Sequence, residues 1–205
     1  MPPSSSVSSP SYWAGLYRRG EDGWEKGRVA PPILRLAASL PPGRVAVLGC
    51  GRGHEALALA GLGWEAVGFD FAAPAVASAR RRARREGSPA SFEQADLFDL
   101  PRLHRGAFDA VCEHTCFCAI DPARRAEYVR AVSAILRPGG ILFGLFYAHG
   151  RPGGPPFDVR AREIRRRFSG RFRISRLEVP GDSHPGREGK ELLALFYRRR
   201  RSQRR

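Results

Sequence analysis

The sequence predicts an α/β protein built on a doubly wound, seven-stranded and mostly parallel sheet. Short apolar runs alternate with helical segments along residues 44–147, the pattern of a parallel sheet covered on both faces. Two more apolar runs near the C-terminus, with no long helix between them, predict an antiparallel hairpin. At 205 residues the chain is long enough for one compact domain and short for two.

The strands are expected where apolar runs stop at glycine, at an acidic residue or at a turn. RVAVLG is the first and EAVGFD, ending at Asp70, is the second. Together the seven predicted strands cover residues 44–49, 65–70, 91–96, 108–114, 141–147, 171–179 and 191–198. Helices are expected over 53–63, 74–86 and 121–136, because Pro74 and Pro122 suit a first helical turn and glycines follow the ends. A ligand crevice is expected beyond the carboxyl ends of the first strands.

The N-terminal region differs from the rest in composition. Residues 1–11 are rich in Pro and Ser and predict a flexible leader. Within residues 12–42, Trp13 and Tyr17, four positions apart, share a predicted helix face and Trp24 follows. One interpretation of this segment is a hydrophobic flap packed on the core. Residues 43–198 form the main domain, and 199–205 form a basic tail.

The cysteines and the apolar runs bear on the compartment. Three of the four cysteines fall within seven residues, which is not the spacing of a secreted disulfide framework. C-x3-C-x-C is not a zinc spacing either, so we expect no metal site. Since no apolar run approaches the roughly eighteen residues of a membrane span and the N-terminus has no signal peptide core, we expect a cytoplasmic protein without a membrane partner.

The charge is unusual. The chain has 35 basic and 20 acidic residues, a net charge of +15, and only Lys26 and Lys190 among the basic residues are not Arg. Such a balance is typical of proteins that bind nucleic acid or anionic membranes. However, eleven of the charges fall in two clusters, on the helix that carries Arg80 to Arg85 and on the tail from Arg198 onward. We therefore expect a solvated basic surface and no specific nucleic-acid partner.

The first turn of the sheet carries the motif that points to a ligand. Gly49, Gly51 and Gly53 occur as G-x-G-x-G, whereas a nicotinamide fingerprint would need its third glycine where His54 stands. A nucleoside ligand without a diphosphate is the better interpretation. Asp70, seventeen residues after Gly53, can accept both ribose hydroxyls. Asp96 and Leu97 follow as a polar and an apolar group for an adenine ring.

These motifs resemble a known family. LGCGRGHE, VGFDF, QADLFDL and LRPGGILFG look like the motifs of class I S-adenosylmethionine-dependent methyltransferases, which have a Rossmann-like fold. YW-x3-Y-x6-WEKG-x3-P, EHTCFCAIDPARR, GGPPFDV and SHPGREGKE are similar to the thiopurine S-methyltransferase superfamily, and within it to the thiol and halide methyltransferase branch. The resemblance implies S-adenosylmethionine as cofactor, bound by Trp13, Tyr17, Trp24, Gly49, Gly51, Asp70, Asp96, Leu97 and His114. Tyr17 replaces the usual Trp of this branch, and His114 replaces a Tyr or Arg.

The resemblance also implies the reaction, an in-line methyl transfer to a thiol, hydrosulfide, thiocyanate or halide ion. We expect the enzyme to be a monomer. Such nucleophiles ionise readily or are already anions, so no obligatory general base is needed. Phe117 and Tyr147 are expected in the substrate wall, and His114 or Tyr147 could help to deprotonate a thiol. The resemblance further implies that residues 12–42 form a lid over the cofactor, whose aromatic side chains could hold the sulfonium cation. Two alternatives stay open: a methyltransferase for a larger or nucleic-acid substrate, and a nucleoside-binding module without catalysis.

Overall fold

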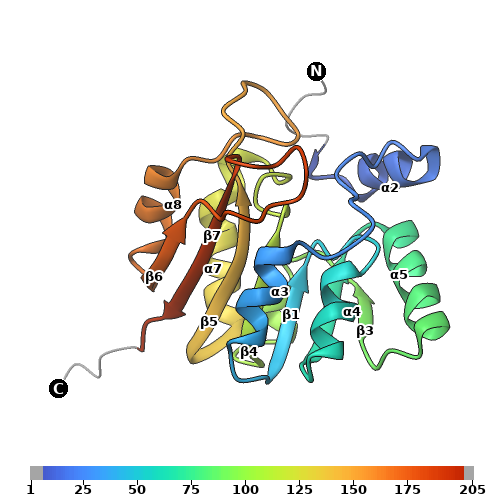
Figure 1. The fold of residues 1–205 in the computed structure, drawn as a ribbon, viewed down its shortest axis with the longest axis horizontal. Coiled ribbons are helices and arrows are strands. Elements are labelled where there is room, and N and C mark those ends of the chain that lie inside the picture. Colours follow the sequence, from blue (N-terminus) through green and yellow to red (C-terminus); the bar gives the residue numbers. More distant parts are fainter. Residues whose placement is uncertain (1–6, 201–205) are drawn as a thin grey trace.

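The computed structural model of the protein describes residues 7–200 (Figure 1). Seven strands form one sheet in the order β3-β2-β1-β4-β5-β7-β6. The first five strands are parallel to one another, and β7 is antiparallel to both β5 and β6. The strands are β1 (Arg44–Leu48), β2 (Glu65–Asp70), β3 (Ser91–Gln94), β4 (Phe108–His114), β5 (Leu136–Tyr147), β6 (Phe172–Glu178) and β7 (Glu191–Arg198). The predicted doubly wound sheet with a C-terminal hairpin is confirmed.

Helices cover both faces of the sheet, and each face has its own apolar core (Figure 1). One core contains Ile33 of α3 and Val76 of α5, and the other contains Tyr128 of α7 and Phe168 of α8. The apolar strands are buried from both sides for this reason. The helices of the two layers are α3 (Pro31–Ala38), α4 (His54–Gly61) and α5 (Ala73–Glu86) on the first face, and α6 (Leu100–Leu103), α7 (Arg125–Ile135) and α8 (Ala161–Phe168) on the second.

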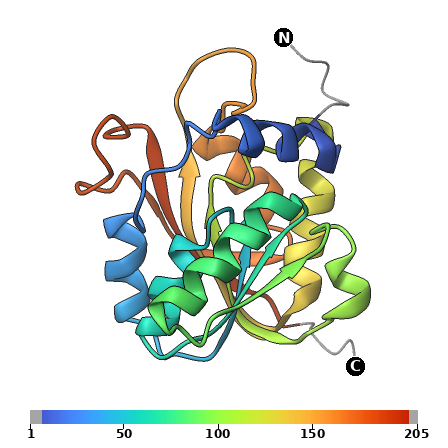
Figure 2. The ribbon, with the colours of Figure 1, turned by 90° about the vertical axis from the view of Figure 1, so that its right-hand side faces the viewer.

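The N-terminal helix lies outside these two layers. α2 (Pro10–Arg19) crosses above the end of the sheet where β1 and β2 finish (Figure 2). It ends at Gly20, whose φ of 68° is the left-handed conformation that closes many helices. The helix begins inside the predicted flexible leader, and Val7 before it is buried. Residues 1–6 of that leader lie outside the described residues.

Several element boundaries differ from the predictions. The third strand ends at Gln94, so Asp96 lies in the following loop. β5 begins at Leu136 rather than at Ile141, because α7 stops at Ile135 and Leu136 is already extended and pairs with Phe108. The short helix α6 and the helix α8 were not predicted. α8 has only two buried residues on a strongly basic segment, so its apolar stripe is weak in the sequence.

The structure describes one of the two predicted arginine clusters, on α5, and only the start of the other, on the C-terminal tail. Arg80, Arg81, Arg84 and Arg85 of α5 are exposed, as expected, whereas Arg82 is half-buried against the His54 ring. The tail prediction falls mostly on residues 201–205, outside the described residues. Between residues 7 and 200, no helix has both the length and the apolar character that crossing a bilayer requires.

Candidate active site

A cavity of about 540 Å³ lies beyond the carboxyl ends of the parallel strands. The loops that follow β1, β2 and β3 contribute Gly49, Phe71 and Asp96, and β5 contributes Tyr147 at its end. This is the crevice predicted for a doubly wound sheet, next to the point where the strand order reverses. Its volume suits a nucleoside-sized ligand together with a small second molecule.

The glycine loop forms the floor of this cavity. Gly49 has a φ of 58°, and a Cβ atom there would lie 3.1 Å from Cys116 Sγ. Gly51 has a φ of 53°, and its amide donates a 3.0 Å hydrogen bond to Asp70 Oδ2. Only glycine adopts this backbone at low cost and leaves the loop open to a ligand. The loop therefore brings backbone groups and the Asp70 carboxylate together.

Asp70 is the buried acidic group of the cavity. Its Oδ1 accepts a hydrogen bond from the Ala72 amide at 2.9 Å, and the side chain lines the cavity although the residue is only 8% exposed. Burial raises the pKa of the Asp70 carboxyl, and the two amide donors oppose this rise. Each carboxylate oxygen keeps a second lone pair, so Asp70 can still accept two hydroxyl groups. This capacity fits the diol of a ribose.

Asp96 and Leu97 lie further along the same edge of the sheet. Asp96 Oδ1 accepts a 2.9 Å hydrogen bond from the Phe98 amide, which fixes the turn after β3. Both residues line the cavity and are half-buried. A carboxylate and an aliphatic face side by side fit the polar edge and the flat face of a purine. Gly49, Asp70 and Asp96 therefore lie in a row at the ends of β1, β2 and β3, and this arrangement fits a nucleoside.

The aromatic segment (residues 10–28) covers the cavity with three rings. The ring centroid of Trp24 lies 5.4 Å from that of Trp13 and 5.5 Å from that of Tyr17, both in edge-to-face geometry. Trp24 Nε1 donates to the Tyr17 hydroxyl at 3.4 Å, and Trp13 Nε1 donates to the Val7 carbonyl at 2.8 Å. All three rings line the cavity. Such aromatic faces can hold a cation.

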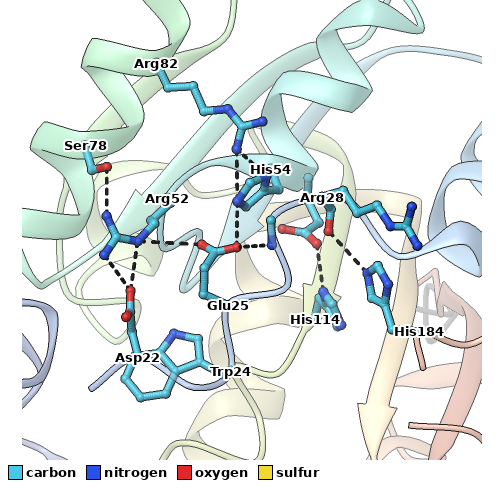
Figure 3. Close-up of polar contacts among 12 residues, drawn as sticks. Asp22, Trp24, Glu25, Arg28, Arg52, His54, Ser78, Arg82, His114 and His184 are labelled. Atoms are coloured by element: carbon cyan, nitrogen blue, oxygen red, sulfur yellow. Dashed lines mark hydrogen bonds and ion pairs between the residues drawn. The ribbon is translucent and has the colours of Figure 1, made fainter. Parts of the chain in front are cut away.

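An outer cluster of charged residues ties the aromatic segment to the glycine loop (Figure 3). Arg52 Nη2 lies 2.6 Å from Asp22 Oδ2, and its Nε lies 3.9 Å from a Glu25 carboxylate oxygen. His54 Nε2 lies 2.6 Å from Glu25 Oε1. Burial acts to raise the pKa of Glu25, but bonds from His54 and the Gly27 amide outweigh it and lower the pKa. The outer cluster comprises Asp22, Glu25, Arg52, His54 and Arg82.

An inner cluster of four charged residues lies deeper, between α4, β4 and β7. His114 Nδ1 donates to Glu55 Oε1 at 2.7 Å, and His114 Nε2 is 3.7 Å from Glu191 Oε1. Arg187 Nη1 donates to the same Glu191 oxygen at 3.3 Å. Burial acts to lower the pKa of His114, but Glu55 and Glu191 outweigh it and raise the pKa to about 9. The inner cluster comprises Glu55, His114, Arg187 and Glu191.

The structure brings most predicted site residues to the cavity. Gly51 contacts the site through Asp70 rather than as a lining residue. The predicted site residues that line the cavity are Trp13, Tyr17, Trp24, Gly49, Asp70, Asp96, Leu97 and Tyr147.

Two predicted positions need correction. Phe117 is fully buried in the core, packed on Tyr128 and Phe146, and does not line the cavity, so it is not part of the substrate wall. Its side chain points inward because the turn after β4 is fixed by the bond from the Phe117 amide to Glu113. His114 does not line the cavity either, since both ring nitrogens face carboxylates. The two carboxylates favour the protonated form of the ring.

Other residues at the site were missed. Arg187 lines the cavity from the loop before β7, although it lies in a stretch that the resemblance had singled out. Thr115 lines the cavity with a φ of 63°, unusual for a non-glycine residue and common at functional sites. Neither has a periodic sequence signal. The four cysteines are buried with free thiols, and no group of three or more metal-ligating side chains is found among residues 7–200.

Known proteins share both the sequence pattern and the fold. The family described as Thiopurine S-methyltransferase (TPMT) matches residues 8–200. Probable thiol methyltransferase 2 of Arabidopsis thaliana is 31% identical over 163 residues, 77% of this chain and 71% of the relative. Thiocyanate methyltransferase 1 of the same plant is 30% identical over 190 residues, 90% of this chain and 83% of the relative.

A solved structure resembles the fold along nearly its whole length. It comes from the study of the conversion of a disulfide bond into a thioacetal group during echinomycin biosynthesis, with a TM-score of 0.79, 26% identity, and coverage of 95% of this chain and 94% of the other. The glycine loop, the Asp70 carboxylate and the aromatic rings fit the sulfonium nucleoside that such enzymes use. The chain belongs to the thiopurine S-methyltransferase family and is an S-adenosylmethionine-dependent methyltransferase.

Proposed function

We propose that the protein methylates a small sulfur nucleophile, such as a thiol, hydrosulfide or thiocyanate, or a halide ion. The observation that carries this proposal is the cover of Trp13, Tyr17 and Trp24 over a cavity of about 540 Å³. A nucleic-acid substrate would need an open basic groove, whereas the exposed arginines of α5 lie on its outer surface. The relatives named for thiol and thiocyanate methylation support the same class.

The chain's contribution to this reaction is positioning. S-adenosylmethionine, when bound, supplies a methyl group that its sulfonium charge already activates. Asp70 and Asp96 would hold the nucleoside beyond the ends of β2 and β3, which leaves the part of the cavity beyond the ends of β4 and β5 for the nucleophile. Tyr147 lies on that side, at the end of β5. The aromatic segment acts as a lid that excludes water from the transfer.

Proton transfer is a minor requirement in this proposal. Thiocyanate, halide and hydrosulfide ions are already anions, and only a thiol has a proton to lose before the transfer. His114 is turned away from the cavity, so Tyr147 is the remaining candidate for assisting a less acidic thiol. We further propose that the enzyme acts as a monomer in the cytoplasm, where its four buried cysteines stay reduced.

Headspace gas chromatography tests the proposed substrate class. The purified enzyme, incubated with S-adenosylmethionine and separately with hydrosulfide, methanethiol, thiocyanate and iodide, should release the matching methylated volatile product. Boiled enzyme and omission of S-adenosylmethionine serve as controls. Absence of product with every member of the panel, from enzyme that binds S-adenosylhomocysteine, would show that the substrate belongs to another class.

Replacing the ribose acid tests how the cofactor is held. Asp70→Asn keeps the shape of the side chain but removes its charge, so S-adenosylhomocysteine should bind about 10- to 100-fold more weakly, since a hydrogen bond to a charged group contributes roughly 1.5–3 kcal/mol. Isothermal titration calorimetry measures the change. Asp99→Ala, an exposed acid outside the cavity, is the control and should bind as the wild type does. Equal affinity of Asp70→Asn and wild type would refute the assignment.

A further inference from the structure

We propose that Arg187 is the anion-binding residue of the substrate site, holding a thiolate, thiocyanate or halide ion at the Tyr147 end of the cavity. This inference rests on the proposed function and names the charge state in which the nucleophile is recognised. Three features of Arg187 suit this role: its location in the cavity, its unused N–H donors and the contacts that fix its orientation.

The place of Arg187 in the sheet puts it at the substrate end. Arg187 precedes β7, and Tyr147 ends β5; these two strands are neighbours, on the opposite side of β1 from β2 and β3 (Figure 1). The Arg187 guanidinium carbon lies 4.6 Å from the centroid of the Tyr147 ring. Both side chains line the cavity that Asp70 and Asp96 line from the other end. Arg187 therefore sits where the nucleophile, rather than the nucleoside, is expected.

The guanidinium group has donors to spare. Arg187 is only 5% exposed, and its two hydrogen bonds within the described residues go to Glu191 Oε1 and to the Trp24 carbonyl, each at 3.3 Å. A guanidinium carries five N–H groups, so three remain for a ligand. A buried cation with unused donors facing a cavity binds an anion strongly, because water screens the attraction poorly there.

Arg187 shares its carboxylate partner within the inner cluster. Glu191 is shared, since its Oε1 also lies 3.7 Å from His114 Nε2. Glu55 binds the other ring nitrogen of His114. The two carboxylates and the two cations balance as a group, but no carboxylate belongs to Arg187 alone. Glu191 and His114 are thus positioning residues that aim the guanidinium into the cavity.

Anion binding by Arg187 fits the chemistry of the transfer. The nucleophile's lone pair forms a bond to the methyl carbon, the bond from that carbon to the sulfonium breaks, and its electron pair stays on the sulfur of S-adenosylhomocysteine. A thiol releases its proton to solvent beforehand, and a guanidinium favours that ionised form by lowering the pKa of a bound thiol. Arg187 would thus select anions and would discriminate against neutral amines.

Arg125 provides a matched control inside the same protein. It is equally buried, its Nη1 donates to Glu163 at 2.9 Å, its Nη2 donates to the Phe157 carbonyl at 3.2 Å, and its guanidinium carbon lies 5.0 Å from the Phe117 ring centroid. Unlike Arg187, it does not line the cavity. The two arginines have similar kinds of neighbours, a glutamate, a backbone carbonyl and an aromatic ring, but only Arg187 reaches the cavity.

The test compares Arg187→Gln, Arg187→Lys and Arg125→Gln with the wild type. Titration of thiocyanate into the S-adenosylhomocysteine complex should show binding roughly 10- to 100-fold weaker for Arg187→Gln, with KM for thiocyanate rising by a similar factor. Affinity for S-adenosylhomocysteine should change less than threefold. Arg187→Lys should recover part of the loss, and nitrate, a non-nucleophilic anion, should compete with thiocyanate in the wild type but not in Arg187→Gln.

The outcomes separate the two proposals. Arg125→Gln should lower the melting temperature while leaving thiocyanate affinity and KM within twofold of the wild type. Unchanged thiocyanate binding in both folded Arg187 variants would overturn the anion site. A wild type that binds thiocyanate through Arg187 but methylates none of the nucleophiles would instead contradict the proposed function and leave the anion site standing.

Discussion

Two carboxylate–histidine pairs start from neighbouring residues of α4, yet they differ in what they join (Figure 3). His54 Nε2 lies 2.6 Å from Glu25 of the aromatic segment, and Glu55 Oε1 lies 2.7 Å from His114 of β4. The first pair belongs to the outer cluster and links the aromatic segment to the start of α4. The second belongs to the inner cluster and links elements of the sheet domain. One helix turn thus anchors two different structures.

The carboxylates around the two histidines differ in their exposure to water. The Glu25 side chain is 21% exposed, whereas Glu191, which faces the other side of His114, is fully buried. Ion pairs that water reaches contribute about 0–1 kcal/mol, because water competes for both charges, and the partial exposure of Glu25 and of Arg52 (35%) brings the outer cluster closer to that limit. Removing one partner of a buried pair costs about 3–5 kcal/mol, because the other charge stays desolvated. The outer cluster is therefore suited to reversible closure and the inner cluster to a fixed arrangement.

Removing the two histidines should give the largest contrast. His114→Gln leaves Glu55 and Glu191 buried without a cation between them, so we expect a loss of about 3 kcal/mol or more in the free energy of unfolding. His54→Gln should cost about 1 kcal/mol or less. Urea unfolding followed by tryptophan fluorescence measures both. Equal losses for the two variants would show that the clusters do not differ as described.

Raising the pH should weaken the inner cluster without any substitution. Burial lowers the pKa of His114, but Glu55 and Glu191 raise it more, to about 9, against 6.5 for an ordinary histidine. The folded protein therefore keeps a proton that the unfolded chain releases, so this contribution to stability is complete below pH 6.5 and is lost as the pH rises through 9. The slope is at most about 1.4 kcal/mol per pH unit.

The difference in unfolding free energy between wild type and His114→Gln isolates this effect from other titrating groups. It should shrink steadily when urea unfolding is repeated between pH 7 and pH 9.5. Arg187 and the two carboxylates face the histidine throughout, so they are common to both proteins. A difference that stays constant over this range would mean that His114 is neutral in the folded protein.

The clusters also show what the sequence could and could not predict. The apolar runs are short and regularly spaced, and the first two end in glycine and in an acid. The sheet and the order Gly49, Asp70, Asp96 therefore follow from periodicity and from the rule that ligands bind at the carboxyl ends of the strands. The roles of His114 and Phe117 could not be predicted, because both depend on which way a side chain turns after β4.

Contacts of charged side chains with partners distant in sequence could not be predicted either. Glu55 and His114 are 59 positions apart, and Arg187 and the Trp24 carbonyl are 163 apart. No spacing rule connects such residues, since their contact depends on the register of β4 and β7 and on the path of the aromatic segment. The Arg cluster of α5 misled for the same reason: Arg82 looked like one more surface charge, but it contacts His54 in the outer cluster.

A substitution in the outer cluster should have the smallest effect on stability and a measurable effect on the rate of cofactor release. Glu25→Gln removes the charge that faces His54 and Arg52, so release of S-adenosylhomocysteine should be about two- to fivefold faster, while the free energy of unfolding changes by less than about 1 kcal/mol. Stopped-flow fluorescence of the lid tryptophans measures the release rate. Salt should speed release in the wild type and have less effect in the variant, because these charges are partly exposed.

Arg19→Gln is the matched control for this last experiment. Arg19 lies on the same segment and pairs with Glu21 at 2.8 Å, but it touches neither the glycine loop nor α4. Its loss should leave the release rate unchanged. The two substitutions change the net charge of the segment in opposite directions, so equal acceleration by both would mean that any disturbance of the segment, rather than loss of the contact with His54, speeds release. A specific effect of Glu25→Gln ties lid closure to the same helix turn that fixes His114 in the inner cluster.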